Sequence, residues 1–293
     1  MSATTTPATK RDYLRVDALE PEELTALLDL AELFKREPVA RLGSLEGQSI
    51  ACYFAKPSTR TRVSFEAAAH RLGALPIMLR PDELQLGRGE PIADTAKVLA
   101  SYCAAIVIRT FAQADIEEVA ANAAVPVINA LTDDHHPCQA LADLLTLREH
   151  FGALAGLRVA YVGADNNVAR SLAQAGALAD MDVVVASPPD DPVAAVRGAQ
   201  AVYTDVWVSM GEDDRRVQLQ RELEPYRVTD ALMDFAAHDA VFLHCLPAHR
   251  GEEVTAEVID GPRSLVFAQA ANRLPTEQAV LYALTTGNWR AEL

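Results

Sequence analysis

The fold of this chain is decided by Ile50-Ala51-Cys52-Tyr53-Phe54, then Lys56-Pro57-Ser58-Thr59-Arg60-Thr61-Arg62, then the run from Val63 to Leu72. The first run is short and apolar, as in a buried strand, and the last has the pattern of a helix. Hydroxyl and guanidinium groups therefore gather at a helix N-terminus, where free N–H groups and the helix dipole bind anions. Arginine adds paired recognition of phosphate oxygens. The motif predicts a site for a small phosphorylated compound; the alternative is a Ser/Thr helix cap with solvated arginines.

Short apolar runs alternate with longer amphipathic runs along the rest of the chain, which is typical of parallel α/β architecture. The expected strands form two series, 49–54, 75–79, 104–108 and 125–129, then 157–162, 182–187, 200–204, 240–244 and 264–267. The expected helices are Pro21 to Arg36, 90–102, 113–123, 135–150, 166–179, 229–237 and Thr276 to Thr286.

This pattern predicts a two-domain α/β protein in which each domain is a parallel sheet flanked by helices. Residues 1–10 are polar and Thr-rich and are expected to form a disordered tail. The first domain is expected at 11–150, and the second, which starts near Gly152 and Gly156, at 151–275. The closing helix, 276–293, is expected to pack back on the first domain.

Composition excludes several classes of function. The chain has 293 residues and a formal net charge of −15, which argues against binding nucleic acid or an anionic membrane surface. No apolar run approaches the roughly 20 residues that span a bilayer, and no signal-peptide pattern is seen. The four cysteines are scattered, without disulfide-scaffold density, and so predict a cytoplasmic protein: Cys52, Cys103, Cys138 and Cys245.

Polar motifs follow the predicted strands repeatedly, and ligands of parallel sheets bind at the carboxyl ends of strands. The motifs are Ser58 to Arg62, Arg109, His135-His136-Pro137-Cys138-Gln139, Asp165-Asn166-Asn167, Asp205 to Gly211 and His244-Cys245-Leu246-Pro247. Their convergence predicts one active site in the cleft between the two domains.

Together these motifs resemble the transcarbamoylase family. Ser-Thr-Arg-Thr-Arg at 58–62 and His-Pro-Cys-Gln at 136–139 resemble its carbamoyl phosphate motifs. Asp-Val-Trp-Val-Ser-Met-Gly at 205–211 and His-Cys-Leu-Pro at 244–247 are similar to the ornithine branch. Gln-Leu-Gly at 85–87 and Asn-Arg-Leu at 272–274 also match in order. The resemblance runs from about residue 12 to 287, and these six motifs in the right order make it highly specific.

The resemblance implies a reaction and an assembly. The reaction transfers a carbamoyl group from carbamoyl phosphate to the δ-amine of L-ornithine, giving L-citrulline and phosphate, as in arginine biosynthesis. No metal and no organic cofactor take part. Family members form trimers, which implies a homo-oligomer here, and Gln85 matches a residue that reaches the neighbouring subunit's site.

The resemblance also assigns carbamoyl phosphate contacts. The phosphate would be bound by Ser58, Thr59, Arg60 and Thr61, with Gln85 supplied by a neighbour. Thr61, Arg109 and His136 would lie at the carbonyl oxygen, where donors stabilise the charge that grows during attack. The carbamoyl nitrogen would be contacted by Gln139 and by the backbone carbonyls near Cys245 and Leu246, while Arg273 would approach from the second domain.

The ornithine contacts are carried over in the same way. Asn167 and the backbone of Met210 would hold the α-carboxylate, and Asp205 and Ser209 the α-amino group. The δ-amine must lose a proton before it attacks, and Asp205 and Cys245 are the candidates to handle it. The Ser-Met-Gly segment would act as a mobile lid. The catalytic set is thus Arg109, His136, Asp205 and Cys245.

Simpler interpretations accompany these assignments. His136 could be a helix-start residue and Cys245 an inert buried thiol. His244, Cys245 and His249 could suggest zinc, but no fourth ligand follows at useful spacing, so no metal site is expected. His70, His150 and His238 are expected to be structural or solvated.

Six positions depart from the usual ornithine pattern: Ala55, His135, Arg170, Ala268, Ala271 and Pro275. Alanines at 55, 268 and 271 remove carboxylates that could orient Arg60 or Arg273. Two alternatives therefore stand beside the ornithine reaction. One is a carbamoyltransferase for another amine, such as putrescine, lysine or a diamino acid; the other is a non-catalytic paralogue.

Overall fold

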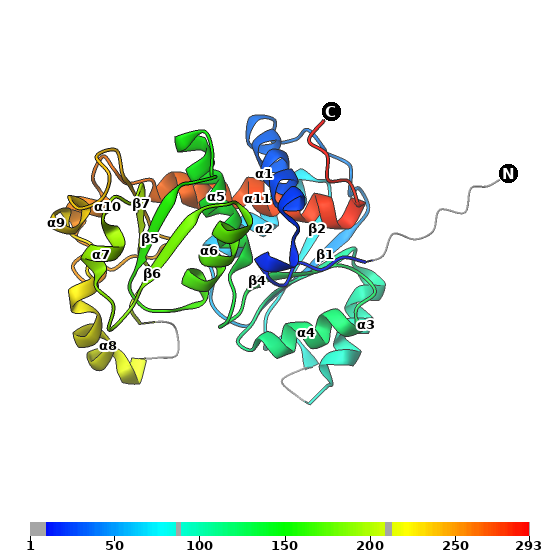
Figure 1. Cartoon of the computed structure of the whole chain (residues 1–293). Helices are drawn as coiled ribbons and strands as arrows, with labels where there is room; N and C mark the ends of the chain where they lie inside the picture. The colour runs from blue at the N-terminus through cyan, green and yellow to red at the C-terminus, as the bar shows by residue number, and fades with distance from the viewer. Residues whose placement is uncertain (1–9, 86–88, 209–212, 293) are drawn as a thin grey trace. The chain divides into compact units, whose positions relative to one another are not determined.

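The computed structural model describes residues 10–85, 89–208 and 213–292. Contacts divide the chain into two compact units (Figure 1). Unit 1 comprises the residues up to Ala18, Thr25–Asp133 and the residues from Leu274. Unit 2 comprises Leu19–Leu24 and Asp134–Arg273, so the contacts group residues 134–150 with unit 2, whereas the sequence pattern placed them in the first domain. The expected tail lies outside the described residues except for Lys10.

Unit 1 contains a parallel sheet of four strands in the order β2-β1-β3-β4. The central strand β3 reads Ala-Ile-Val-Ile-Arg and is buried throughout, as expected for a parallel strand covered on both faces. Figure 1 shows α2 on one side of the sheet and α3 and α4 on the other. The bounds are β1 Ser49–Phe54, β2 Leu75–Leu79, β3 Ala105–Arg109, β4 Val127–Leu131, η1 Val16–Ala18, α1 Pro21–Arg36, α2 Arg60–Arg71, α3 Ile92–Tyr102 and α4 Gln113–Asn122.

Unit 2 contains a second parallel sheet, in the order β6-β5-β7-β8. Figure 1 shows α5 and α6 on one side of it and α7 and α9 on the other. The bounds are β5 Arg158–Val162, β6 Asp182–Ala186, β7 Ala201–Tyr203, β8 Val241–Leu243, α5 Pro137–Phe151, α6 Asn167–Leu178, α7 Pro192–Val196, η3 Asp213–Arg215, α8 Arg216–Leu223, η4 Glu224–Tyr226, α9 Asp230–Met233 and α10 Ala256–Ile259. Helix α11, Val266–Thr286, begins in unit 2 and ends in unit 1.

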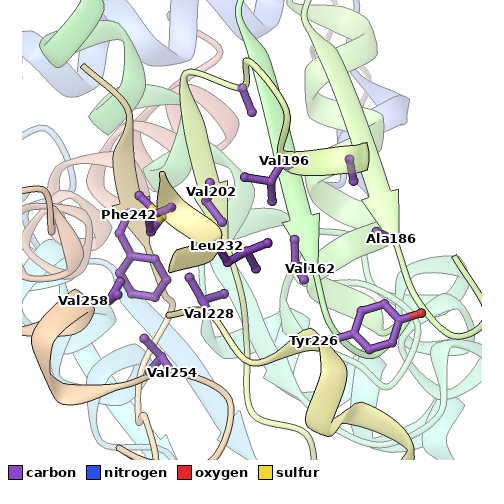
Figure 2. Close-up of a cluster of buried hydrophobic side chains, with 14 of the residues drawn as sticks. Val162, Ala186, Val196, Val202, Tyr226, Val228, Leu232, Phe242, Val254 and Val258 are labelled. Atoms are coloured by element: carbon purple, nitrogen blue, oxygen red, sulfur yellow. The ribbon is translucent and has the colours of Figure 1, made fainter. Parts of the chain in front are cut away.

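The core of unit 2 combines aliphatic and aromatic side chains. Figure 2 shows Val162, Val202 and Phe242, from β5, β7 and β8, among side chains from the surrounding helices and loops. Val202 and Phe242 are fully buried. Burial of this apolar surface, worth about 25 cal/mol per Å², holds the strands whose carboxyl ends carry the polar motifs.

The predicted fold class is confirmed, and eight predicted strands are present. The ninth, at 264–267, is wrong. Ser264 makes only an isolated bridge to Phe242, and α11 already begins at Val266 instead of Thr276. The predicted helix at 229–237 shrinks to α9, Asp230–Met233. Among the described residues, no helix is both long and apolar enough to cross a membrane.

The order of the strands in each sheet indicates where a ligand would bind. In each sheet the chain moves in opposite directions from one strand pair, β1 and β3 in unit 1 and β5 and β7 in unit 2. Ligands of open parallel sheets bind where such a reversal leaves a crevice beyond the carboxyl ends. The polar motifs after β1, β3, β5 and β7 therefore stand where the topology favours binding.

Candidate functional site

The anion-binding motif forms the entrance of α2 in unit 1. Helix α2 begins at Arg60, and Thr59 occupies the position before it without a side-chain capping bond. Thr59 therefore occupies the cap position, as the alternative interpretation expects, but its side chain does not cap the helix. No acidic residue lies in the first turn, so the positive end of the helix dipole is not neutralised locally. Thr61 is 2% exposed, so its hydroxyl is almost fully buried.

Two of the cationic groups in this motif are already paired. Lys56 is buried, forms an ion pair with Asp133 and lies 4.2 Å from the ring centre of Phe111. Arg62 Nε lies 3.3 Å from Glu66 Oε1, one helical turn away. Arg60, the other guanidinium of the predicted Arg60/Arg62 cluster, is the first residue of α2.

Arg109 lies beside the anion-binding motif. It ends β3, pairs in register with Phe54, and its carbonyl oxygen accepts the Ala55 N–H at 2.8 Å. Arg109 is only 7% exposed, so little water screens its guanidinium charge. Electrostatic interactions of this group are therefore stronger than those of a surface arginine. Ala55, where the usual pattern has a carboxylate, thus contacts Arg109 through this backbone hydrogen bond.

In unit 2, α5 begins with the His-Pro-Cys-Gln motif. His136 occupies the residue before the helix, Pro137 the first turn, and the His136 N–H donates to Ser171 Oγ at 2.8 Å. Proline suits this position because the N–H it lacks has no partner within the helix. The interpretation of His136 as a helix-start residue is correct for its backbone, but its side chain makes no capping bond.

Gln139 belongs to a buried polar cluster centred on Asp143, one turn further along α5. Gln139 Oε1 accepts from Arg273 NH1 at 2.8 Å, and Gln139 Nε2 donates to Asp143 Oδ1 at 2.8 Å. Asp143 Oδ1 also accepts from Gln269 Nε2 at 2.6 Å and from the Tyr203 hydroxyl at 3.4 Å. Burial raises the pKa of Asp143 to about 7, although these hydrogen bonds oppose the rise.

Asp205 and Cys245 follow β7 and β8 and form a hydrogen-bonded pair. The Cys245 thiol donates to Asp205 Oδ1 at 3.0 Å, while Asp205 Oδ2 accepts from Asn166 Nδ2 at 3.0 Å. Asn166 caps α6 by accepting from the N–H groups of Val168 and Ala169, which aligns Asn167 as the first residue of the helix. Burial, and next the negative charge of Asp205, raise the pKa of Cys245 well above its usual range.

His244 supports the turn that carries Cys245 and Leu246. The Leu246 N–H donates to His244 Nδ1 at 2.8 Å, so the ring hydrogen is assigned to Nε2, which lies 3.3 Å from Glu253 Oε1. Both His244 and Glu253 are fully buried. Leu246 has a φ of +58°, a left-handed conformation uncommon outside glycine, so its geometry depends on such support.

The structure offers two groups whose ligand atoms lie within 4.8 Å of one another: Asp205, His244 and Cys245, and His249, Glu252 and Glu253. In the first, both His244 nitrogens are engaged by Leu246 and Glu253, which leaves two donors. In the second, Glu252 is paired with Arg216 at 2.7 Å. Neither arrangement offers the open three- or four-ligand set that zinc requires.

Six further residues singled out from the sequence are either exposed or outside the described residues. Gln85 is exposed, while Ser209 and Met210 lie outside the described residues. Ala268 and Ala271 are exposed on α11, and Arg170 is exposed with its Nε 3.3 Å from the Asp134 carbonyl oxygen. The alanines at 268 and 271 were expected to remove carboxylates that orient Arg60 or Arg273; Arg273 is oriented instead by its bond to Gln139.

Known proteins match this arrangement over most of the chain. Residues 11–149 match the model described as the carbamoyl-P binding domain of aspartate/ornithine carbamoyltransferase, and residues 189–284 match its Asp/Orn binding domain. The chain belongs to the aspartate/ornithine carbamoyltransferase family. The resemblance predicted from the motifs is confirmed.

Relatives within this carbamoyltransferase family are similar over nearly their full length. An ornithine carbamoyltransferase of Acidothermus cellulolyticus is 49% identical, with 92% of this chain and 95% of that protein covered. The structure of the ornithine carbamoyltransferase from Pyrococcus furiosus aligns with a TM-score of 0.91 at 44% identity, covering 97% and 99% of the two chains. That from Thermus thermophilus aligns with a TM-score of 0.87 at 44% identity, covering 96% and 99%.

Sequence reasoning missed three residues of the site: Asp143, Gln269 and Glu253. Asp143 had a visible signal, since it is the one charged residue in the run 137–147, whose members are all buried. Gln269 had none, because it contacts Asp143 from 126 positions away along the chain. Glu253 had none either, because nothing in the sequence indicates that it turns back to His244, nine positions earlier.

Proposed function

We propose that this protein transfers the carbamoyl group of carbamoyl phosphate to the δ-amine of L-ornithine, giving L-citrulline and phosphate. The observation that carries the proposal is the Asp205–Cys245 pair, which lies within residues 189–284 matched by the Asp/Orn binding domain and is hydrogen-bonded to Asn166. Full-length similarity to proteins named ornithine carbamoyltransferase supports it.

The first step is binding of carbamoyl phosphate. Ser58, Thr59, Arg60 and Thr61 bind the phosphate through the entrance of α2, with its unneutralised dipole. Gln139 Oε1 accepts from the carbamoyl nitrogen, together with the backbone carbonyl oxygens of Cys245 and Leu246. Arg273, held in place by Gln139, contacts the same ligand.

The second step is attack of the δ-nitrogen lone pair on the carbamoyl carbon. A C–N bond forms and the carbonyl π electrons move to oxygen, where Thr61, Arg109 and His136 donate hydrogen bonds to the developing charge. The C–O bond to phosphate then breaks, and phosphate leaves with that electron pair. Arg109 is suited to this role because its guanidinium is poorly hydrated before the charge appears.

The amine also loses two protons: the first before attack, and the second to the departing phosphate once the C–N bond has formed. The geometry favours Asp205 over Cys245 as the group that takes the first. Because its pKa is raised, Cys245 is a neutral thiol near pH 7 and already gives its hydrogen to Asp205 Oδ1. A thiol donor cannot also be the base. Asp205 therefore receives the ammonium of ornithine, and Cys245 orients the carboxylate.

Recognition of the amino-acid end completes the proposal. Asn167, at the start of α6, binds the α-carboxylate with the dipole of that helix. Met210 contributes its backbone, and Asp205 and Ser209 bind the α-amino group; Ser209 and Met210 belong to a segment outside the described residues.

A panel of amines at equal concentration tests the substrate. Ornithine, putrescine, lysine and a shorter diamino acid are each supplied with carbamoyl phosphate, and the carbamoylated products are measured. We expect ornithine to give the highest kcat/KM. Another amine ranking first would replace ornithine, and no turnover with any amine by folded protein would favour a non-catalytic role.

We further propose a homotrimer in which Gln85 of one subunit completes the site of its neighbour. Unit 1 has exposed apolar side chains on β2, on α2 and in the segment 37–47, and contact with another subunit would cover them. These residues are Val39, Leu42, Val63, Leu75 and Ile77. The segment packs on the end of α2 through the Leu45 N–H and the Leu72 carbonyl oxygen, 2.9 Å apart. Strand β2 is also a sheet edge, which proteins rarely leave uncovered.

Mixed assemblies test the shared site. Gln85→Ala and Cys245→Ala subunits, each weakly active, are unfolded together and reassembled. Random mixing restores both residues at about one quarter of the sites if Gln85 acts in the neighbouring subunit. Activity that never exceeds the average of the two parents would reject the shared site.

A cytoplasmic role in arginine biosynthesis fits these proposals. All four cysteines are free thiols, as a reducing compartment requires. Growth of an arginine-requiring strain that lacks this activity, restored by the present chain, is the test.

A further inference from the structure

Asp143 accepts three hydrogen bonds in unit 2, yet no step of the proposed reaction uses it. The residue is fully buried on α5, and its donors come from α5, β7 and α11. All three bonds end on Oδ1, while Oδ2 is buried without a hydrogen-bond partner. A buried carboxylate is costly unless hydrogen bonds compensate for the lost hydration. Its presence among Leu and Ala side chains therefore calls for a role.

The bond to Gln139 determines which way that side-chain amide faces. An ionised carboxylate can only accept, so it selects the Nε2 end of Gln139 and turns Oε1 the other way. Oε1 then faces the donors of Arg273. The N–H groups of a carbamoyl nitrogen are donors as well, and they need the same oxygen.

Asp143 also reaches the turn that follows β8. Gln269 donates from Nε2 to Asp143 Oδ1, and its Oε1 accepts the His244 N–H at 2.9 Å. One carboxylate therefore sets the orientation of two amides: Gln139, beside Arg273, and Gln269, beside the residues that lead into Cys245 and Leu246.

We propose that Asp143 is a positioning residue for the carbamoyl group, which it serves by fixing the amide of Gln139 with its oxygen toward the ligand. This inference rests on the proposed function, because carbamoyl phosphate is the ligand that Gln139 is taken to bind. Asp143 acts through Gln139 and does not touch the substrate.

The charge state of Asp143 supports this role. Its pKa of about 7 means that the carboxyl exchanges its proton near neutral pH, and the protonated form is a weaker acceptor for Gln139. The ionisable groups around it are Tyr203 on β7, Arg273 on α11 and Cys245 after β8. Burial raises the pKa of both Tyr203 and Cys245, so both stay neutral near pH 7, and Arg273 stays charged.

A double-mutant cycle tests whether Asp143 acts through Gln139. Dissociation constants for carbamoyl phosphate are measured at pH 8 for the unsubstituted protein, Asp143→Asn, Gln139→Ala and the double variant. Asparagine can turn Nδ2 toward Gln139, which lets that amide flip and present hydrogens to the ligand. We expect Asp143→Asn to weaken binding about tenfold alone and less than twofold in the Gln139→Ala background.

Inorganic phosphate at the same pH is the matched probe, because it lacks the carbamoyl group. Its affinity is expected to stay within twofold in Asp143→Asn. Equal weakening of carbamoyl phosphate in both backgrounds, or weakening of both ligands alike, would show a merely structural role and overturn the inference. If the unsubstituted protein does not bind carbamoyl phosphate, the proposed function fails instead.

A spectroscopic measurement needs no folded Asp143 variant. The side-chain amide signals of Gln139, assigned by their loss in Gln139→Ala, are followed by NMR from pH 5.5 to 8.5. We expect them to shift with an apparent pKa near 7 as the bond to Asp143 changes. Signals that stay constant across this range would overturn the inference.

Discussion

Glu253→Met should destabilise unit 2 and damage the Cys245–Leu246 turn. Methionine has a similar volume but no acceptor for the His244 Nε2–H, which is fully buried, or for the N–H of His249, which is partly exposed. A buried donor left without an acceptor costs about 1–3 kcal/mol, and the partly exposed one costs less. We therefore expect a loss of about 2–4 kcal/mol in the free energy of unfolding.

Glu253→Gln is the matched control, because its amide oxygen can still accept both bonds. It should cost about 1 kcal/mol or less, which is the ordinary difference between a charged and a neutral acceptor. Urea unfolding followed by tyrosine and tryptophan fluorescence measures both variants. The two should also differ in function, since a freed His244 no longer holds the left-handed Leu246: the KM for carbamoyl phosphate should rise more in the Met variant.

The pH dependence of this effect has a definite sign. Burial raises the pKa of Glu253, but hydrogen bonds from His244 and from backbone N–H groups outweigh it, and the net pKa is lowered. Glu253 therefore adds stability above its unfolded pKa, about 4.3, and that stability is lost as the pH falls through the folded value. Below pH 4 the gap between the unsubstituted protein and Glu253→Gln should close. A Met variant within 0.5 kcal/mol of the unsubstituted protein at pH 7 would refute the reasoning.

Three further predictions concern the proposed reaction. Arg60→Ala should weaken carbamoyl phosphate and inorganic phosphate by about ten- to a hundredfold, because it removes charge-assisted bonds; calorimetric affinities equal to the parent's would move the phosphate site elsewhere. Cys245→Ala should lower kcat while phosphate affinity is kept, and unchanged turnover would remove Cys245 from the mechanism. Asp205→Asn should lower the Cys245 pKa by removing the adjacent negative charge, so Cys245 should react faster with iodoacetamide at pH 8, as measured by mass spectrometry against Cys103.

Motifs that reflect local rules were predictable from the sequence. The junction around Arg60 combines a short apolar strand with a helix start, and both are properties of neighbouring residues. The prediction of a strand at 264–267 was wrong because it also rested on a local pattern. Leu265-Val266-Phe267 is apolar and short, and periodicity cannot separate a strand from the first turn of a helix at that length. Here the helix continues to Thr286, which decides the outcome.

Contacts between distant residues were beyond the reach of pattern reading. Ala268 and Ala271 were expected to remove partners of Arg273, but the partner is Gln139 on another helix. His244 was considered as a zinc ligand, whereas its two nitrogens hold Leu246 and Glu253. Each case depends on which side chains the sheet brings together, and spacing along the chain does not reveal it.

The polar cluster of unit 2 has a consequence for how the protein is made. Gln269 and Arg273 are separated from Asp143 and Gln139 by 126 and 134 positions along the chain. A ribosome that adds 5–20 residues per second would need roughly 6–27 s to supply them after Asp143 and Gln139 are made. During that interval Asp143 and Gln139 lack their partners from α11. A nascent chain should therefore reach binding competence only when its last helix has emerged, and any truncation before Gln269 should yield a protein without a carbamoyl site.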